Sequence, residues 1–204
     1  MEERYARVVA ALEKRGIKAI YVPDKEGAQQ ELLERIPAGA SVGIGGSMTI
    51  QELEVEEALA AKGCEVVWHW RAPSPDQIDP LRRRALGCDF YLASSNALTE
   101  DGRLVNIDGT GNRVMGMVYG PRRVILVVGV NKLAADLGAA LDRIRREACP
   151  ANARRLKRKT PCAATGQCND CNSPDRMCQV TTIIEGKPSS TDLEVILVGE
   201  KLGY

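Results

Sequence analysis

The sequence predicts an α/β protein with a mostly parallel sheet that carries helices on both faces. Helical and strand-like patterns alternate over residues 1–150, at lengths typical of β-α-β units. The run 124–130 is almost wholly apolar and β-branched, as expected for a strand that is buried on both faces. A chain of 204 residues with 44% hydrophobic content is also long enough to bury one substantial core.

The elements of the first part follow from apolar spacing and from stop signals. Tyr5, Val8, Val9 and Leu12 repeat at helical spacing, and Gly16 marks the end of this first helix. The same signals predict strand 17–22, a helix capped by Asp24 and closed by Pro37, strand 41–44, a helix over 49–62 with a Thr49/Glu52 capping box, and strand 66–68. A Pro-rich loop at 71–77, a short helix at 81–86, strand 89–93, strand 124–130 and an amphipathic helix at 132–147 complete this region.

Two segments depart from the alternation. Residues 97–107 read as a β-hairpin insertion that turns at Asp101-Gly102, a pair that favours a two-residue primed turn. After Cys149 the chain loses periodicity for about thirty residues and then resumes with β-rich runs at 180–184 and 193–198. We therefore expect an α/β domain at 1–150, followed by a Cys-rich extension at 151–204 whose last strands pack on the same domain.

Charge and hydropathy exclude several classes of function. With 28 basic and 27 acidic side chains the net charge is +1, which gives no whole-protein argument for binding nucleic acid. No apolar stretch approaches the length of a membrane span, and the charged start Met1–Arg4 lacks the apolar core of a signal peptide. The expected location is the cytoplasm, where clustered cysteines indicate metal or redox chemistry before disulfides.

A glycine-rich loop follows the strand predicted at 41–44. Gly45, Gly46 and Ser47 stand where a parallel strand runs into a helix, the usual position of ligands in such sheets. Glycines there let backbone N–H groups approach an anion, and the helix N-terminus adds partial positive charge. A tight turn that needs positive φ is the equally weighted structural alternative.

A second polar loop is richer in hydrogen-bonding groups. It combines Asn96 with the segment 106–113, which offers donors and acceptors but little apolar surface. Its candidate ligand-binding residues are Asn106, Asp108, Gly109, Asn112 and Arg113. A small anionic ligand is the expected occupant, although Asn and Asp also build turns by themselves. Asp108 and Glu100 are the candidate catalytic carboxylates, and for Glu100 a solvated hairpin tip is the competing interpretation.

The motifs IGGSMTIQEL and SSNALTEDGRLVNIDGTGNRVMGMVYGPRRVILVVGVNKL, together with the cysteine-bearing tail, resemble the LUD-domain family, the lactate-utilisation proteins. The resemblance spans nearly the whole chain. It implies a fold like that of ribose-5-phosphate isomerase, glucosamine-6-phosphate deaminase and coenzyme A transferases, with self-association common among relatives. It also implies a role in oxidising L-lactate to pyruvate with iron–sulfur partner proteins, and one cleft formed by Gly45, Gly46, Ser47, Asn96, Asp108 and Asn112. No nicotinamide or flavin fingerprint is complete, so any further redox cofactor would belong to a partner.

Four cysteines of the tail have the spacing C-x5-C-x2-C-x6-C: Cys162, Cys168, Cys171 and Cys178. The segment has little apolar mass, so we expect four thiolates on a common centre to give it order. A [4Fe–4S] cluster is the favoured centre, with zinc and no metal as alternatives. Cys149 is either a fifth participant or the end of the preceding helix.

The leading hypothesis is therefore a component of an iron–sulfur-linked system that oxidises lactate. Eight basic residues lie between Arg143 and Lys159. Such a run is usually a solvated helix face. Beside an iron–sulfur site, the alternatives are that it offsets the negative charge of the cluster or docks an acidic redox partner. One alternative is a stand-alone enzyme for a phosphorylated or carboxylate substrate, with structural zinc and with Asp108 or Glu100 as acid/base. Another is an assembly subunit without an active site. Trp68, His69 and Trp70 suggest either a stacking surface or packing at a strand end.

Overall fold

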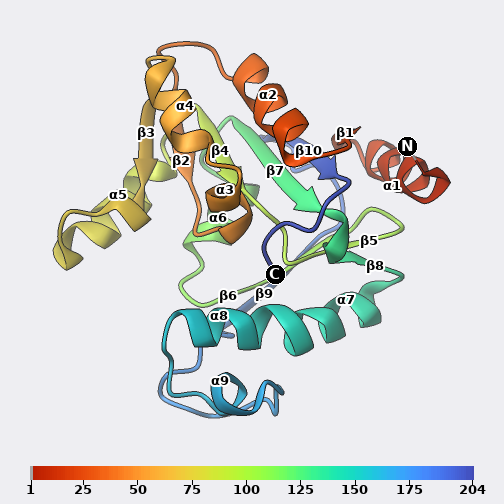
Figure 1. Cartoon of the computed structure of the whole chain (residues 1–204), viewed down its shortest axis with the longest axis vertical. Helices are drawn as coiled ribbons and strands as arrows, with labels where there is room; N and C mark the ends of the chain where they lie inside the picture. Colours follow the sequence, from red (N-terminus) through yellow and green to blue (C-terminus); the bar gives the residue numbers. More distant parts are fainter. Residues whose placement is uncertain (1) are drawn as a thin grey trace.

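The computed structural model describes residues 2–204, which form two sheets and surrounding helices (Figure 1). The larger sheet has six strands, and every pairing in it is parallel. In spatial order they are β1 (Lys18–Val22), β10 (Asp192–Val198), β7 (Arg123–Gly129), β4 (Phe90–Ala93), β2 (Ser41–Ile44) and β3 (Glu65–Trp68). The predicted mostly parallel sheet is confirmed, and its last strand in sequence, β10, lies between β1 and β7.

Helices cover both faces of this sheet, as predicted. One face packs against α2 (Lys25–Arg35), α3 (Met48–Glu52) and α4 (Val55–Ala61). The other face packs against α1 (Glu3–Lys14), α5 (Ile78–Ala85) and α6 (Asn112–Val118). Alternate residues of each strand belong to the two cores: in β7, Val124 and Leu126 face one and Ile125 and Val127 the other.

A second sheet contains the predicted hairpin. Its four strands are β8 (Leu133–Ala134), β5 (Ala97–Thr99), β6 (Leu104–Asp108) and β9 (Val180–Ile184), in that spatial order. Leu98, Leu104 and Ile184 join the core of the large sheet, whereas Ala97 and Val105 pack against the helices below. The hairpin is thus the centre of a sheet rather than an isolated insertion, because the extension supplies β9 as its antiparallel neighbour.

The turn of this hairpin differs from the prediction. The Thr99 N–H donates to the Arg103 carbonyl at 2.9 Å, and the Gly102 N–H donates to the Thr99 carbonyl at 2.9 Å. A three-residue loop, Glu100–Gly102, therefore connects the strands. Gly102 has φ +88°, and Asp101 is absent from the described residues with positive φ, so this is no two-residue primed turn.

The helix predicted at 49–62 is two helices, α3 and α4, because Glu54 takes a left-handed conformation with φ 52° between them. Ser47 caps α3 by accepting from the Ile50 N–H at 3.3 Å, so the Thr49/Glu52 capping box was wrong. The short helix predicted at 81–86 begins earlier, as α5. Short 3-10 turns lie at His69–Arg71, Pro75–Gln77 and Val130–Lys132.

The helix predicted at 132–147 begins later and extends further. Asp136 caps α7 (Leu137–Arg143), which continues through a π-helical stretch, Ile144–Ala148, into α8 (Cys149–Arg155). The interpretation of Cys149 as the end of the helix was therefore wrong. In Figure 1 these elements form one long rod beneath the second sheet, and the tail with α9 (Pro161–Thr165) lies below it. No helix within residues 2–204 has the length and apolar character to cross a membrane.

Candidate functional site

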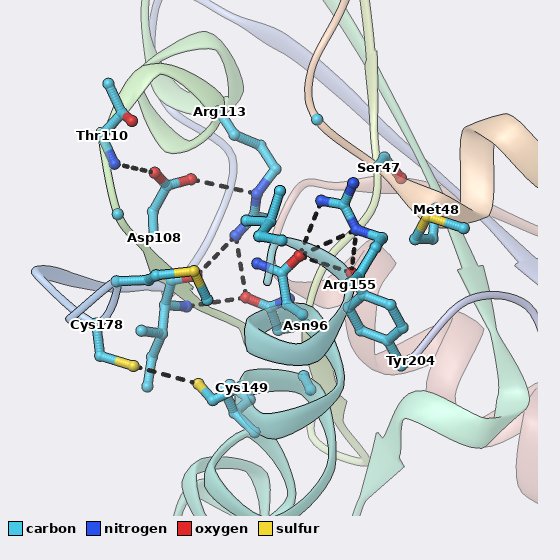
Figure 2. Close-up of a pocket in the computed structure, with 18 of the residues that line it drawn as sticks. Ser47, Met48, Asn96, Asp108, Thr110, Arg113, Cys149, Arg155, Cys178 and Tyr204 are labelled. Carbon is cyan, nitrogen blue, oxygen red and sulfur yellow. Dashed lines mark hydrogen bonds and ion pairs between the residues drawn. The ribbon is translucent and has the colours of Figure 1, made fainter. Parts of the chain in front are cut away.

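A polar cleft of about 330 Å³ lies at the carboxyl ends of β2, β3, β4 and β7 (Figure 2). Each of these strands is followed by residues that line the cleft: Ser47, His69, Ser94 and Lys132. Because the strands are parallel, all four loops emerge at the same edge of the sheet. The second sheet, α8 and the tail form the remaining walls. This volume is in the range of pockets for small molecules.

Most of the candidate ligand-binding residues meet in this cleft. Those that line it are Gly46, Ser47, Asn96, Asp108, Gly109, Asn112 and Arg113. Gly45 and Asn106 are not among the lining residues: Asn106 accepts a hydrogen bond from Arg113, and Gly45 lies next to the Arg113 side chain, where a Cβ would crowd it. The residues that the family resemblance groups around one cleft are therefore close in space.

Arg113 is the structural centre of the second polar loop. Its side chain is almost completely buried, and each of its three side-chain nitrogens has a protein partner. Nη1 and Nη2 donate to the oxygen atoms Ser94 O, Asn106 Oδ1, Asn96 Oδ1 and Ile107 O, and Nε lies 3.3 Å from Asp108 Oδ2. Arg113 therefore holds the loop in shape, and a ligand finds its hydrogen-bond donors already occupied.

Asp108 is similarly engaged. Its Oδ1 accepts from the Thr110 and Gly111 N–H groups at 3.0 and 2.7 Å, and its Oδ2 faces Arg113 (Figure 2). This arrangement forms a turn at the end of β6 and leaves the carboxylate without a free oxygen for acid/base work. Asn96 differs, because its Oδ1 accepts from Ile107 N and Arg113 while no described residue accepts from its amide nitrogen.

The glycine loop serves close packing. A Cβ at position 45 would lie 2.9 Å from Tyr91 Oη and 3.2 Å from Arg113 Cγ, and one at position 46 would lie 3.5 Å from the His69 ring. Neither glycine is among the described residues with positive φ, so the tight-turn alternative was wrong. The glycines bring β2 against the side chains that shape the cleft.

Glu100 lies outside the cleft. It occupies the hairpin tip, where its Oε1 is 2.8 Å from Arg4 Nε and its side chain is 40% exposed. This placement matches the solvated-tip interpretation.

His69 is a cleft residue whose role the sequence analysis left open. It follows β3, is 8% exposed and lines the cleft beside Gly46. Burial, followed by the charges of Arg82 and Arg155, lowers the pKa of His69 to about 4, so the ring is neutral at physiological pH. Trp68 and Trp70 stack on each other with ring centroids 5.2 Å apart, which is packing at a strand end.

Lys132 is a second cleft residue that the sequence analysis missed. Its side chain is 3% exposed, and its Nζ donates to Thr49 Oγ1 at 2.6 Å and to Ser94 Oγ at 2.9 Å. Burial, followed by the charges of Arg143 and Arg113, lowers the pKa of Lys132 to about 7. Its position just after the buried strand β7, at the edge that carries the other loops, was the signal available in the sequence.

The roof of the cleft comes from α8 and the C-terminus. Arg155 donates to Tyr204 Oη at 2.9 Å and to Asn152 Oδ1, which also accepts from the Tyr204 hydroxyl at 2.6 Å (Figure 2). The Arg155 guanidinium also lies over the Trp70 ring, 4.5 Å from its centroid. Part of the basic run is therefore cleft wall.

The tail cysteines border one cavity next to the cleft. Cys162, Cys168, Cys171 and Cys178 all line it, and so does Cys149 from α8. The sulfur atoms of Cys149 and Cys178 share a hydrogen bond at 3.5 Å (Figure 2). That hydrogen bond, with the nearby Arg176 charge, lowers the pKa of Cys178 to about 7, while Cys178 and burial raise the pKa of Cys149.

The tail has more internal order than its composition predicts. Arg176 donates to the Cys178 and Cys171 carbonyls at 3.0 and 2.6 Å and pairs with Asp170 at 2.8 Å. Asp175 accepts from the Lys159 N–H at 2.8 Å. Side chains therefore satisfy several backbone groups of this segment, while the ordering of the tail by sulfur ligands stays a prediction. Across residues 2–204, no three His, Cys, Asp or Glu side chains converge on a point that would hold a single metal ion.

Comparisons with known proteins match this fold to one family. The family model described as the LUD domain matches residues 5–198. Among solved structures, the crystal structure of a DUF162 family protein from Deinococcus radiodurans is similar, with a TM-score of 0.53, 15% sequence identity and coverage of 96% of each chain. At that identity the likeness concerns the fold. No curated protein matches the chain.

Proposed function

The chain belongs to the LUD-domain family, and from this premise we propose that it is a lactate-utilisation protein. In this proposal the cleft binds a small carboxylate, the tail cysteines hold a [4Fe–4S] cluster, and the protein works with iron–sulfur partners in oxidising L-lactate to pyruvate. One observation carries the proposal: the cleft and the cysteine cavity share a wall. The residues that line both are Ile107, Cys149, Arg176, Met177 and Cys178.

The charges in the cleft support an anionic ligand. Its basic lining residues are Arg82, Arg113, Lys132, Arg155, Arg158 and Arg176, against the acidic residues Asp108 and Asp175. Asp108 is neutralised by Arg113, and His69 carries no charge at neutral pH. The surplus of positive charge therefore attracts a carboxylate, and the Ser47 hydroxyl and the Asn96 amide nitrogen face the cleft as further donors.

The donor set of the second cavity fits an iron–sulfur cluster. Cys162, Cys168, Cys171 and Cys178 would hold it, with Cys149 as a fifth thiol on the same cavity. A [4Fe–4S] cluster is held by four Cys thiolates, which is the number that the tail itself supplies.

The protein's own groups define what this arrangement does. The cleft residues bind and orient the anion, and Arg155, held by Tyr204, adds a positive charge to the cleft wall. Arg145 and Arg176 line the cysteine cavity and offset negative charge there. When bound, a cluster at this position supplies one-electron transfer beside the ligand. The exposed basic residues Arg154, Lys157 and Lys159 provide a docking face for an acidic redox partner.

The geometry gives less support to the stand-alone enzyme with a carboxylate acid/base. Asp108 has both oxygens engaged, and Glu100 lies at the hairpin tip.

Anaerobic metal analysis tests the cluster directly. We expect the full chain, purified without oxygen, to be coloured and to contain iron and acid-labile sulfide in equal amounts. The double variant Cys168→Ser/Cys171→Ser should lose most of both, because it removes two of the four ligands.

Cys64→Ser is the matched control. The Cys64 thiol donates to the Pro37 carbonyl at 3.4 Å, far along the chain from the tail, and a serine hydroxyl can do the same. Its iron content should equal that of the wild type. Stoichiometric zinc in place of iron, or unchanged iron in the double variant, would contradict the proposal.

A further inference from the structure

Lys132 is a buried cation without a protein counter-ion. Its two hydrogen-bond acceptors are the neutral hydroxyls of Thr49 and Ser94. Glu52 acts on it electrostatically, but the Glu52 carboxylate accepts from the Gly203 N–H at 2.7 Å. None of the ion pairs formed within residues 2–204 includes Lys132. Buried charges in proteins are normally paired, so a negative partner is missing here.

The two hydroxyls are arranged to accept from Lys132. Thr49 Oγ1 passes its own proton toward the Leu202 carbonyl at 3.3 Å, and Ser94 Oγ toward the Ser95 carbonyl at 3.4 Å. Two of the three N–H positions on the amine therefore have partners. The third position is a lone pair in the neutral amine and an unpaired N–H in the ammonium.

The surroundings leave room for a ligand at this amine. Lys132, Thr49 and Ser94 all line the cleft. Gly203, with φ +58°, stands where a Cβ would lie 2.7 Å from Thr49 Oγ1 and 3.4 Å from Lys132 Nζ. A residue with a side chain would crowd the amine and its acceptor, so the close approach and the positive φ require glycine at this position.

We propose that Lys132 binds the carboxylate of a small 2-oxo or 2-hydroxy acid as an ammonium, and that it takes up a proton when the acid binds. This inference rests on the proposed function and assigns the recognition of its substrate class to one side chain. The carboxylate supplies the missing counter-ion and accepts the third N–H. Ser47 and Asn96 remain to donate to the other oxygens of the acid.

The pH dependence follows from the groups around the amine. Arg143 of α7 and Arg113 of α6 act on it with like charge, while Glu52 of α3 has the opposite charge. With a pKa of about 7 in the free protein, Lys132 is increasingly neutral above neutrality. A ligand that requires the ammonium should then bind up to about tenfold more weakly for each pH unit above that point.

Calorimetric titration of the anaerobically purified full chain tests this proposal. The probes are pyruvate, L-lactate and inorganic phosphate, each measured between about pH 6 and about pH 9. Repeating the pyruvate titration in buffers of different ionisation enthalpy gives the number of protons taken up. The variant is Lys132→Met, which keeps the length and the apolar stem, and the control is Lys201→Met, an exposed lysine outside the cleft.

We expect the wild type to bind both acids more tightly than phosphate, with proton uptake near and above neutral pH. Lys132→Met should bind pyruvate about tenfold or more weakly, without proton uptake, and Lys201→Met should match the wild type. Proton uptake on pyruvate binding is measured with the wild type alone. The proposal can therefore be tested even if Lys132→Met folds poorly.

Three outcomes would overturn the role of Lys132 alone: equal pyruvate binding by Lys132→Met, absence of proton uptake in the wild type, or a borohydride-trapped covalent pyruvate adduct on Lys132. Phosphate that binds more tightly than either acid would overturn the substrate class. Failure of the wild type to bind either acid contradicts the proposed function as well.

Discussion

Arg113 shows how a single side chain connects sequence, fold and site. As a basic residue in a polar loop it was predicted to bind the ligand, but its nitrogens are occupied by protein acceptors from β4, β5 and β6 and their loops. The sequence identified the loop that matters because polar residues cluster in it. It could not show which of them face inward, since that depends on how the two sheets meet.

Replacing Arg113 should therefore damage the fold before it affects binding. In Arg113→Met, the Asn106 and Asn96 amide oxygens and the Asp108 carboxylate lose their main donor while buried, which should lower the free energy of unfolding by about 3–5 kcal/mol. Urea unfolding measures this change. The control Arg83→Met, which removes an 80% exposed partner of Asp79, should change it by less than about 1 kcal/mol. A loss below about 1 kcal/mol in Arg113→Met would contradict the structural role.

Among elements, the strands and their mostly parallel pairing were predictable, their spatial order was not, and helix boundaries were predicted only in part. Apolar runs and the rule that ligands lie at the carboxyl ends of parallel strands correctly placed Gly45–Ser47 at the sheet edge that carries the cleft, and the family resemblance grouped Asn96 with them. The same rule applied to β3 and β7 would also have found His69 and Lys132. The break at Glu54 and the continuation through Cys149 were missed, because a left-handed residue and a π-helical stretch have no periodic signal.

The contact between β2 and α5 gives a prediction at this scale. A Cβ on Gly43 would lie 2.3 Å from the Ala85 carbonyl oxygen, a backbone atom that cannot move without shifting α5. Gly43→Ala should therefore destabilise the protein by about 2–3 kcal/mol in chemical denaturation. Gly87→Ala, where the nearest atom is 3.6 Å away, should change stability by less than about 1 kcal/mol. Equal free energies of unfolding for the two variants would contradict this prediction, because they would mean that α5 can shift without loss of stability.

At the scale of the whole molecule, the fold joins segments that are distant in sequence. The C-terminal strand β10 lies between β1 and β7, and β9 completes the second sheet beside β6. This topology places the tail cysteines beside the cleft, with Cys149 and Cys178 on both cavities. Sequence spacing could group the four tail cysteines and offer Cys149 as a fifth, but it could not decide the role of Cys149 or set the cysteines against the polar loops.

The central claim is that the cleft and the cysteine cavity act as one unit through their common wall. It is tested most directly by electron paramagnetic resonance of the anaerobically purified protein after chemical reduction, with and without pyruvate. We predict an iron–sulfur signal whose shape changes when pyruvate binds in the wild type, and a much smaller change in Lys132→Met at the same pyruvate concentration. A wild-type spectrum that stays the same at pyruvate concentrations that fill the cleft would contradict the claim.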